Sequence, residues 1–130
     1  MLQKPKRKLK ILTIDDSEVI RTVILSMLRG HFCTFASNTE KGISQYELLH
    51  PEIVFLDINL PDINGMDALK MIRQYDNNAY VIMLTGSSQL PDVIEAMKLG
   101  ASGYMVKPFS KKKMVMALER YMVQHQDQVS

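Results

Sequence analysis

Short apolar runs divide the chain into segments of alternating character. Four runs stand out: Leu9–Ile14, Ile53–Ile58, Tyr80–Leu84 and Gly103–Val106. Three of the four are nearly continuous in Ile, Val, Leu and aromatic residues, which is typical of strands covered on both faces. A weaker run over Cys33–Ala36 predicts a fifth strand nearer an edge of the sheet.

The stretches between these runs show helical spacing. Apolar residues from Val19 to Leu28, and again from Met114 to Met122, recur at intervals of one, three and four, which indicates one apolar stripe on each helix. Residues that commonly begin or end helices flank these stretches. They are Asp16 and Ser17 before the first helix, Gly30 after it, Pro91 at the start of a helix that runs to Gly100, and Ser110 before the last helix. Strand and helix alternate five times, which predicts an α/β fold with a doubly wound five-stranded parallel sheet and five helices.

Polar residues gather where the predicted strands end. Asp15 and Asp16 follow the first strand, Asp57 lies at the end of the third, Thr85 at the end of the fourth and Lys107 at the end of the fifth. Function collects at the carboxyl ends of the strands in parallel α/β sheets. If the central strands are neighbours, three carboxylates, a hydroxyl and an ammonium share one small pocket.

This set of groups predicts phosphoryl chemistry. Three close carboxylates repel one another unless a cation is present, and Mg²⁺ takes one or two carboxylates together with substrate oxygens. Thr85 can donate a hydrogen bond to a phosphoryl oxygen, and Lys107 can neutralise another. Asp57 is the best candidate nucleophile, because it is the single acid at the end of the most apolar strand. The prediction is metal-dependent phosphoryl transfer onto, or off, an aspartate.

Each of these residues also has an ordinary structural explanation when it is taken alone. Asp15 or Asp16 can cap a helix, Thr85 can belong to a turn, and Lys107 can be an exposed lysine at a strand end. Asp57 is harder to explain in this way, because burying an unpaired acid is costly. The coincidence of all of them at strand ends favours the functional interpretation.

Length and composition limit the class of protein. The chain has 130 residues, of which 46% are hydrophobic and 23% charged, as in an ordinary globular domain. The single cysteine, Cys33, excludes an intrachain disulfide and a thiolate zinc cluster. No apolar run approaches the ~18 residues of a membrane span. We expect one soluble, cytoplasmic domain over residues 1–130, with a core of about 8–125, a basic arm at 1–7 and a polar tail at 123–130.

The net charge of +2 hides an uneven distribution. Residues 1–10 hold five basic residues and no acidic ones, which leaves 11 basic and 14 acidic residues in the rest of the chain. A basic arm on an acidic body can contact nucleic acid or anionic lipid. A solubilising leader is the favoured interpretation of this arm.

Four motifs in this order resemble those of the receiver domain of two-component response regulators, the group that includes the chemotaxis response regulator. The resemblance covers roughly residues 8–125 and implies the flavodoxin-like receiver topology. The motifs are Ile14-Asp15-Asp16-Ser17, then Asp57-Ile58-Asn59-Leu60-Pro61-Asp62-Ile63-Asn64-Gly65, then Leu84-Thr85-Gly86, and then Lys107-Pro108-Phe109.

The resemblance implies a role for each acidic residue of the predicted site. Asp57 would be the phosphoacceptor in a Mg²⁺-dependent reaction. Asp16 would bind the metal directly and Asp15 through water, while Asp57 and the backbone carbonyl of Asn59 would complete the protein ligands.

The resemblance also implies a switch. Thr85 would move toward the phosphoryl group, Lys107 would pair with it, and the Lys107–Pro108 bond would be cis. Tyr104 would turn inward when Thr85 moves, and its alternative role is an aromatic that fills a strand position. The surface whose fit to a partner changes is formed by helix 91–99, strand 103–106 and helix 110–122.

The resemblance implies a signalling protein rather than an enzyme, apart from its own phosphorylation and dephosphorylation. The phosphoryl donor would be a histidine kinase or a histidine phosphotransfer protein, and an unknown downstream protein would receive the signal. Whether phosphorylation promotes a homodimer stays open. We expect no membrane span and no nucleic-acid binding by the domain itself.

Three alternatives remain. The chain can be the receiver fragment of a longer DNA-binding or enzymatic response regulator. It can be an aspartyl-phosphate phosphatase resembling the haloacid dehalogenase group. Such an enzyme would require a second aspartate, as its acid/base, at the position of Asn59. A nucleic-acid binder that uses the basic arm is the third, and the acidic body and the lack of a stacking platform argue against it.

Overall fold

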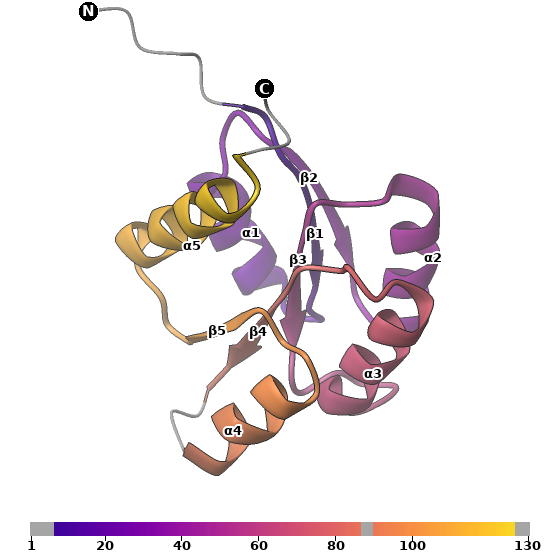
Figure 1. Cartoon of the computed structure of the whole chain (residues 1–130). Helices are drawn as coiled ribbons and strands as arrows, with labels where there is room; N and C mark the ends of the chain where they lie inside the picture. Colours follow the sequence, from indigo (N-terminus) through magenta and orange to yellow (C-terminus); the bar gives the residue numbers. More distant parts are fainter. Residues whose placement is uncertain (1–6, 87–89, 127–130) are drawn as a thin grey trace, which may run out of the picture.

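The computed structural model describes residues 7–86 and 90–126. Most of the predicted basic arm, residues 1–6, and the end of the predicted polar tail, residues 127–130, lie outside the described residues, as do residues 87–89. Strands and helices alternate along the chain (Figure 1). The strands are β1 (Lys10–Ile14), β2 (Phe32–Ala36), β3 (Ile53–Asp57), β4 (Val81–Thr85) and β5 (Gly103–Val106). The helices are α1 (Glu18–Met27), α2 (Thr39–Leu49), α3 (Gly65–Tyr75), α4 (Leu90–Lys98) and α5 (Lys111–Gln124).

The five strands form one parallel sheet in the order β2-β1-β3-β4-β5. The predicted doubly wound fold is therefore confirmed, and the weak run at Cys33–Ala36 is an edge strand as expected. The order reverses between β1 and β3, since β2 lies on one side of β1 and the later strands lie on the other. Ligands of doubly wound folds bind at the carboxyl ends of the strands at such a reversal.

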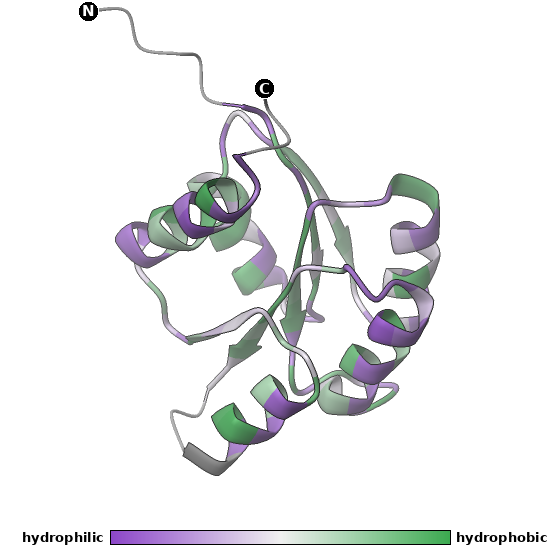
Figure 2. Cartoon of the chain, in the orientation of Figure 1, coloured by the Kyte–Doolittle hydropathy of each residue, from purple (hydrophilic) through white to green (hydrophobic). Residues whose placement is uncertain are grey.

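Helices cover both faces of the sheet and bury two apolar clusters (Figure 1). Residues of α2, α3 and α4 pack on one face, against side chains such as Leu12, Leu56 and Met83. Residues of α1 and α5 pack on the other, against side chains such as Ile11, Phe55 and Leu84. Figure 2 shows the hydrophobic residues along the strands and on the inner sides of the helices. The alternation of the two sets along each strand explains why the strand runs are apolar without interruption.

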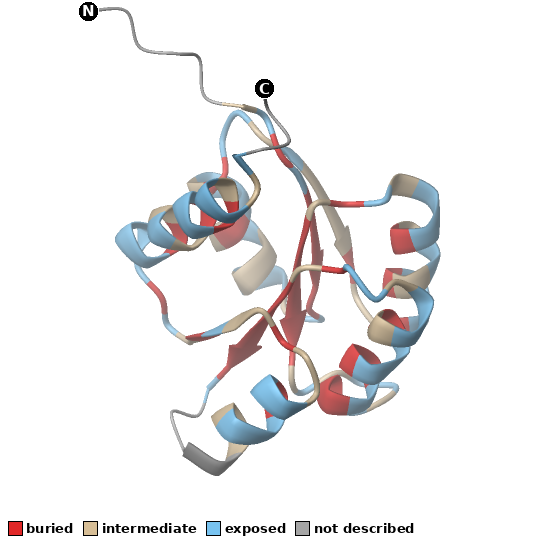
Figure 3. Ribbon diagram, in the orientation of Figure 1, coloured by how far each residue is buried: buried red, intermediate tan, exposed pale blue. Residues whose placement is uncertain are grey.

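Burial falls toward the edges of the sheet (Figure 3). All residues of β3 and β4 are buried, whereas β2 and β5 at the edges are mostly half-buried. The third and fourth strands begin or end one residue away from the predicted runs, so that Asp57 and Thr85 are the last residues of their strands. Both polar side chains therefore lie at the rim of the core.

The predicted helix boundaries are close to those of the structure. Ser17 and Ser110 are N-caps whose hydroxyls accept hydrogen bonds from Ile20 and Lys113 backbone N–H groups. Asp16 was also predicted as a capping residue, but the structure assigns that role to Ser17 alone. The side chain of Asp16 therefore remains exposed at the carboxyl edge of the sheet.

Candidate functional site

Two carboxylates are buried side by side at the end of β1 and β3. Asp57 ends β3 with 4% of its surface exposed, and Asp15 follows β1 with none exposed. The backbone N–H of Asp15 donates to the carbonyl of Ala36 at 2.9 Å, which continues the pairing of β1 with β2. With the exposed Asp16, each offers a carboxylate oxygen, and these oxygens lie within 4.8 Å of one another. The structure thus brings together the three acids predicted from strand ends.

Lys107 supplies an ammonium to both buried acids. Its Nζ lies 2.9 Å from Asp15 Oδ2 and 3.3 Å from Asp57 Oδ1. The Lys107 backbone N–H donates to the carbonyl of Thr85 at 2.7 Å, and the Lys107–Pro108 peptide bond is cis. Three carboxylates therefore face one ammonium, which leaves an excess of negative charge.

Backbone N–H groups hold the two buried carboxylates in place. Ser17 N–H donates to Asp15 Oδ1 at 2.9 Å, and Asn59 N–H donates to Asp57 Oδ1 at 3.2 Å. The segment after β3 folds back so that Asn59 pairs with Asn64. This brings the backbone of Asn59 beside the acid that it contacts.

Gly65 makes this return of the chain possible. A Cβ atom at Gly65 would lie 2.4 Å from the backbone carbonyl oxygen of Asp57 and 2.4 Å from the Cα of Ile58, too close for any side chain. The Gly65 N–H donates to the Ile58 carbonyl at 2.6 Å. Gly65 is thus a positioning residue for the acid at the end of β3, a role that no sequence pattern assigned to it.

The electrostatics of the site favour a cation. Burial raises the pKa of Asp57, and the nearby Asp15 carboxylate acts in the same direction, while the Asn59 N–H and the Lys107 ammonium oppose the shift. A divalent ion with oxygen ligands would offset the excess negative charge. The three carboxylates of Asp15, Asp16 and Asp57 could hold such an ion.

Thr85 and Tyr104, the two predicted switch residues, differ in their burial. Thr85 ends β4 and is 5% exposed, whereas Tyr104 on β5 is 45% exposed. Tyr104 lines a groove of about 360 Å³ between β5 and α5 with Met105, Val106, Lys113, Met116, Ala117 and Arg120. In this structure Tyr104 therefore occupies an outward position.

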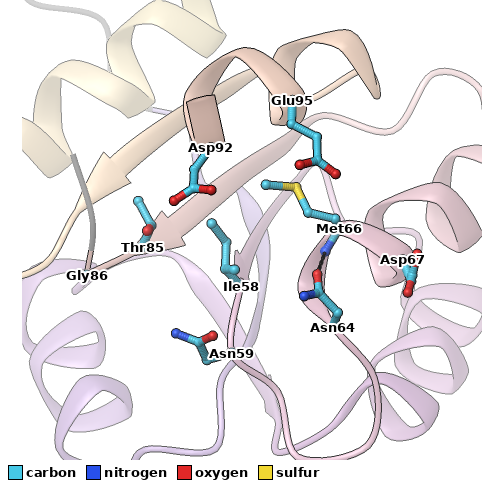
Figure 4. A pocket seen from close by; sticks show the side chains of 9 residues that line it. All are labelled: Ile58, Asn59, Asn64, Met66, Asp67, Thr85, Gly86, Asp92 and Glu95. Carbon is cyan, nitrogen blue, oxygen red and sulfur yellow. Dashed lines mark hydrogen bonds between the residues drawn. The ribbon is translucent and has the colours of Figure 1, made fainter. Parts of the chain in front are cut away.

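A pocket of about 520 Å³ adjoins the acids at the same edge of the sheet (Figure 4). Thr85, Gly86, Ile58 and Asn59 form its wall on the side of the sheet; α3 and the turn before it supply Asn64, Met66 and Asp67, and α4 supplies Asp92 and Glu95. The pattern of polar residues at strand ends does not include the two acids of α4, because they belong to a helix face and follow no strand. Only the packing of α4 beside β4 brings them to this edge.

Comparisons with known proteins agree with this architecture. The family model of the response regulator receiver domain matches residues 11–119. The chemotaxis protein CheY of Thermotoga maritima is 34% identical over 114 residues, which are 85% of this chain and 95% of that protein. The regulatory protein AtoC of Escherichia coli is 28% identical over 113 residues, which are 85% of this chain but 24% of that protein. The structure of the chemotaxis protein CheY4 of Vibrio cholerae superimposes with a TM-score of 0.82 at 24% identity, over 88% of this chain and 99% of that one.

The chain belongs to the response regulator receiver domain family of two-component systems. Receiver domains are typically signalling domains, and membership implies a kinase partner and a downstream target. Within the described part of the chain, no helix has the length and hydropathy needed to span a membrane.

Proposed function

We propose that this receiver accepts a phosphoryl group on Asp57 from a phosphohistidine, in a Mg²⁺-dependent reaction. The donor would be a histidine kinase or a histidine phosphotransfer protein in the cytoplasm. The observation that carries the proposal is the buried pair of carboxylates that share one ammonium at the β1–β3 reversal. Bound Mg²⁺ would supply positive charge where the transferred phosphoryl group gathers negative charge.

The residues of the chain have distinct parts in this transfer. A carboxylate oxygen of Asp57 attacks phosphorus as the bond from phosphorus to the histidine nitrogen breaks. The Lys107 ammonium, already 3.3 Å from Asp57 Oδ1, pairs with a phosphoryl oxygen, and the Thr85 hydroxyl donates to another. The Asn59 N–H keeps the carboxylate oriented through its 3.2 Å hydrogen bond.

The proposed output is a change in the surface formed by α4, β5 and α5. Phosphorylation replaces the single charge of the Asp57 carboxylate with a phosphoryl group that carries close to two negative charges beside Lys107, and Thr85 then moves toward it. The inward position of Tyr104 would become favoured. The surface formed by α4, β5 and α5 would then shift toward the conformation that accompanies this position.

Charge on this surface favours an acidic partner. Lys113 and Arg120 flank the groove that contains Tyr104 and Met116, and both of these apolar side chains are exposed. Lys98, Lys111 and Lys112 add to the positive charge of the same three elements. An acidic segment with apolar side chains would match this surface.

A Thr85→Ala variant tests the switch. We expect the variant to be labelled at Asp57, while amide hydrogen exchange in β5 and α5 no longer changes on phosphorylation. Thr34→Ala, on the edge strand β2, is the matched control and should respond as wild type does. A full exchange response in Thr85→Ala would contradict the proposed switch.

A further inference from the structure

The pocket beside the phosphoacceptor carries more negative charge than the predicted chemistry uses. Asp67, Asp92 and Glu95 line it, and none of the described residues that line it is Lys, Arg or His. Asp67 is compensated by Lys70, whose Nζ lies 3.6 Å away. Neither Asp92 nor Glu95 forms an ion pair with any residue that the structure describes.

The two uncompensated acids face the route to the site. In Figure 4 the carboxylates of Asp92 and Glu95 extend from α4 toward the wall formed by Thr85 and Ile58 and toward Met66. Asn59, whose N–H contacts the carboxylate of Asp57, lines the same pocket. A phosphodonor that reaches Asp57 beside Asn59 and Thr85 therefore experiences the negative electrostatic potential of the Asp92 and Glu95 carboxylates.

Helix electrostatics explain only one of the two acids. Asp92 lies in the first turn of α4, where a negative charge interacts favourably with the helix dipole. Glu95 lies beyond that turn, so the dipole gives no reason for its charge. A cleft lined by charges of one sign concentrates ligands of the opposite sign and repels those of the same sign.

We propose that Asp92 and Glu95 are specificity-determining residues of the receiver that disfavour small dianionic phosphodonors. This inference rests on the proposed phosphorylation of Asp57. An acyl phosphate brings two negative charges into the pocket, whereas a donor with one charge is repelled less. A donor protein that presents basic side chains beside its phosphohistidine would be favoured by the same field.

The test compares two small donors on the same protein. Acetyl phosphate is a dianion near neutral pH; Asp57 attacks its phosphorus, the P–O bond breaks and acetate leaves. Phosphoramidate is mainly a monoanion whose nitrogen carries the proton as –NH₃⁺; Asp57 attacks its phosphorus, the P–N bond breaks and ammonia leaves. The measured quantity is the ratio of the two labelling rates, by intact mass with Mg²⁺. Effects of a substitution on metal binding or on the fold act on both rates and cancel in the ratio.

In the Asp92→Asn, Glu95→Gln double variant, we expect the ratio of the acetyl phosphate rate to the phosphoramidate rate to rise on the order of three- to ten-fold. This range is typical of removing unit charges near an anion at a protein surface. Glu95→Gln alone should give a smaller rise and leaves the first turn of α4 intact. Added salt should shrink the difference from wild type.

Glu47→Gln is the matched control, since Glu47 is an exposed acid on α2 with no ion pair among the described residues. Its ratio should equal that of wild type. An unchanged ratio in the double variant and in Glu95→Gln, with both donors labelling Asp57, would overturn the inference and leave the proposed function standing. Failure of both donors to label any of these proteins would overturn the proposed function and the inference with it.

Discussion

The two edges of the sheet differ in how their charged side chains are paired. At the carboxyl edge, where the strands end, Asp15 and Asp57 are buried and share the single ammonium of Lys107. At the amino edge, where the strands begin, Arg7 forms an ion pair with Glu52, a contact that is also a hydrogen bond. Among the described residues, the carboxyl edge sets two buried carboxylates against one ammonium, whereas the amino edge holds an ion pair of one cation and one anion.

The amino edge also provides partners for its buried tyrosines. The hydroxyl of Tyr46 donates to Asp76 Oδ2 at 2.7 Å, between the end of α2 and the end of α3. Tyr121 stacks on His125 with ring centroids 4.0 Å apart, and Tyr80 meets Tyr121 edge-on at 4.9 Å. Among the described residues, the one cluster of acids that could hold a metal lies at the carboxyl edge and not here.

The contrast indicates which edge the fold uses for stability and which for chemistry. Burying two carboxylates against one ammonium costs free energy unless a further cation is present. The amino edge shows that the same fold can balance its charges. We therefore interpret the imbalance at the carboxyl edge as a requirement of the proposed function.

Removing the shared ammonium should have the largest effect on stability. In Lys107→Ala, Asp15 and Asp57 lose their cation, and we expect the free energy of unfolding in metal-free buffer to fall by about 2–3 kcal/mol, less than for a fully buried pair because the Lys107 side chain is 21% exposed. Urea denaturation with and without Mg²⁺ measures this change. Mg²⁺ should recover part of the loss.

The control for this substitution is Lys41→Ala, an exposed lysine of α2 with no ion pair among the described residues. It should change the free energy of unfolding little, in either buffer. If Lys107→Ala and wild type had the same free energy of unfolding in metal-free buffer, the excess negative charge at the carboxyl edge would not destabilise the fold.

A smaller effect is expected from Tyr46→Phe at the amino edge. The variant loses a hydrogen bond to a carboxylate, and we expect the free energy of unfolding at neutral pH to fall by about 1–2 kcal/mol. The hydrogen bond from Tyr46 lowers the pKa of Asp76 in the folded state. The stabilisation that the ionised Asp76 gains from this hydrogen bond is therefore complete above the pKa of Asp76 in the unfolded chain, about 3.9. It is lost as the pH falls through the lower pKa of Asp76 in the folded protein.

Urea denaturation of wild type and Tyr46→Phe from neutral pH down to about pH 3 measures this dependence. The difference between the two proteins should shrink as the pH falls, and Mg²⁺ should not change it. Tyr75→Phe, an exposed tyrosine whose ring meets Tyr46 edge-on, is the control and should show no such pH dependence. A difference that stays constant with pH would exclude the Asp76 carboxylate as its cause.

The smallest of these effects is expected from Arg7→Ala. The Arg7–Glu52 pair is partly exposed, with 33% and 23% of the two side chains accessible, so we expect a loss of about 1 kcal/mol or less. The loss should fall with added salt and should not respond to Mg²⁺, which thermal denaturation in both conditions can measure. A response to Mg²⁺ as large as that of Lys107→Ala would remove the distinction between the two edges.

The sequence predicted most of the fold because the strands are buried on both faces. Continuous apolar runs at Ile53–Ile58 and Tyr80–Leu84 gave two central strands within one residue of their ends. The carboxyl-end rule then placed Asp15, Asp57 and Lys107 at one edge, and the structure brings them within contact. Their roles in metal binding and phosphoryl transfer stay predictions.

What the sequence could not predict depends on packing between distant segments. Arg7 belongs to the stretch that was interpreted as a solubilising arm, but it pairs with Glu52, 45 residues away. Gly65 is required by a backbone approach that exists only after the chain folds back. Glu95 lies on a helix whose spacing fixes its face, but only the tertiary packing shows that this face borders the site.

The most direct test of the central claim is the intact mass of wild type and of Asp57→Asn after incubation with Mg²⁺ and phosphoramidate. We expect one added phosphoryl group on wild type, no addition when Mg²⁺ is chelated, and none on Asp57→Asn. The variant should fold at least as stably as wild type without metal, because it removes one of two buried carboxylates that share an ammonium. An adduct that persists in a folded Asp57→Asn protein, or a wild type that remains unlabelled, would contradict the account.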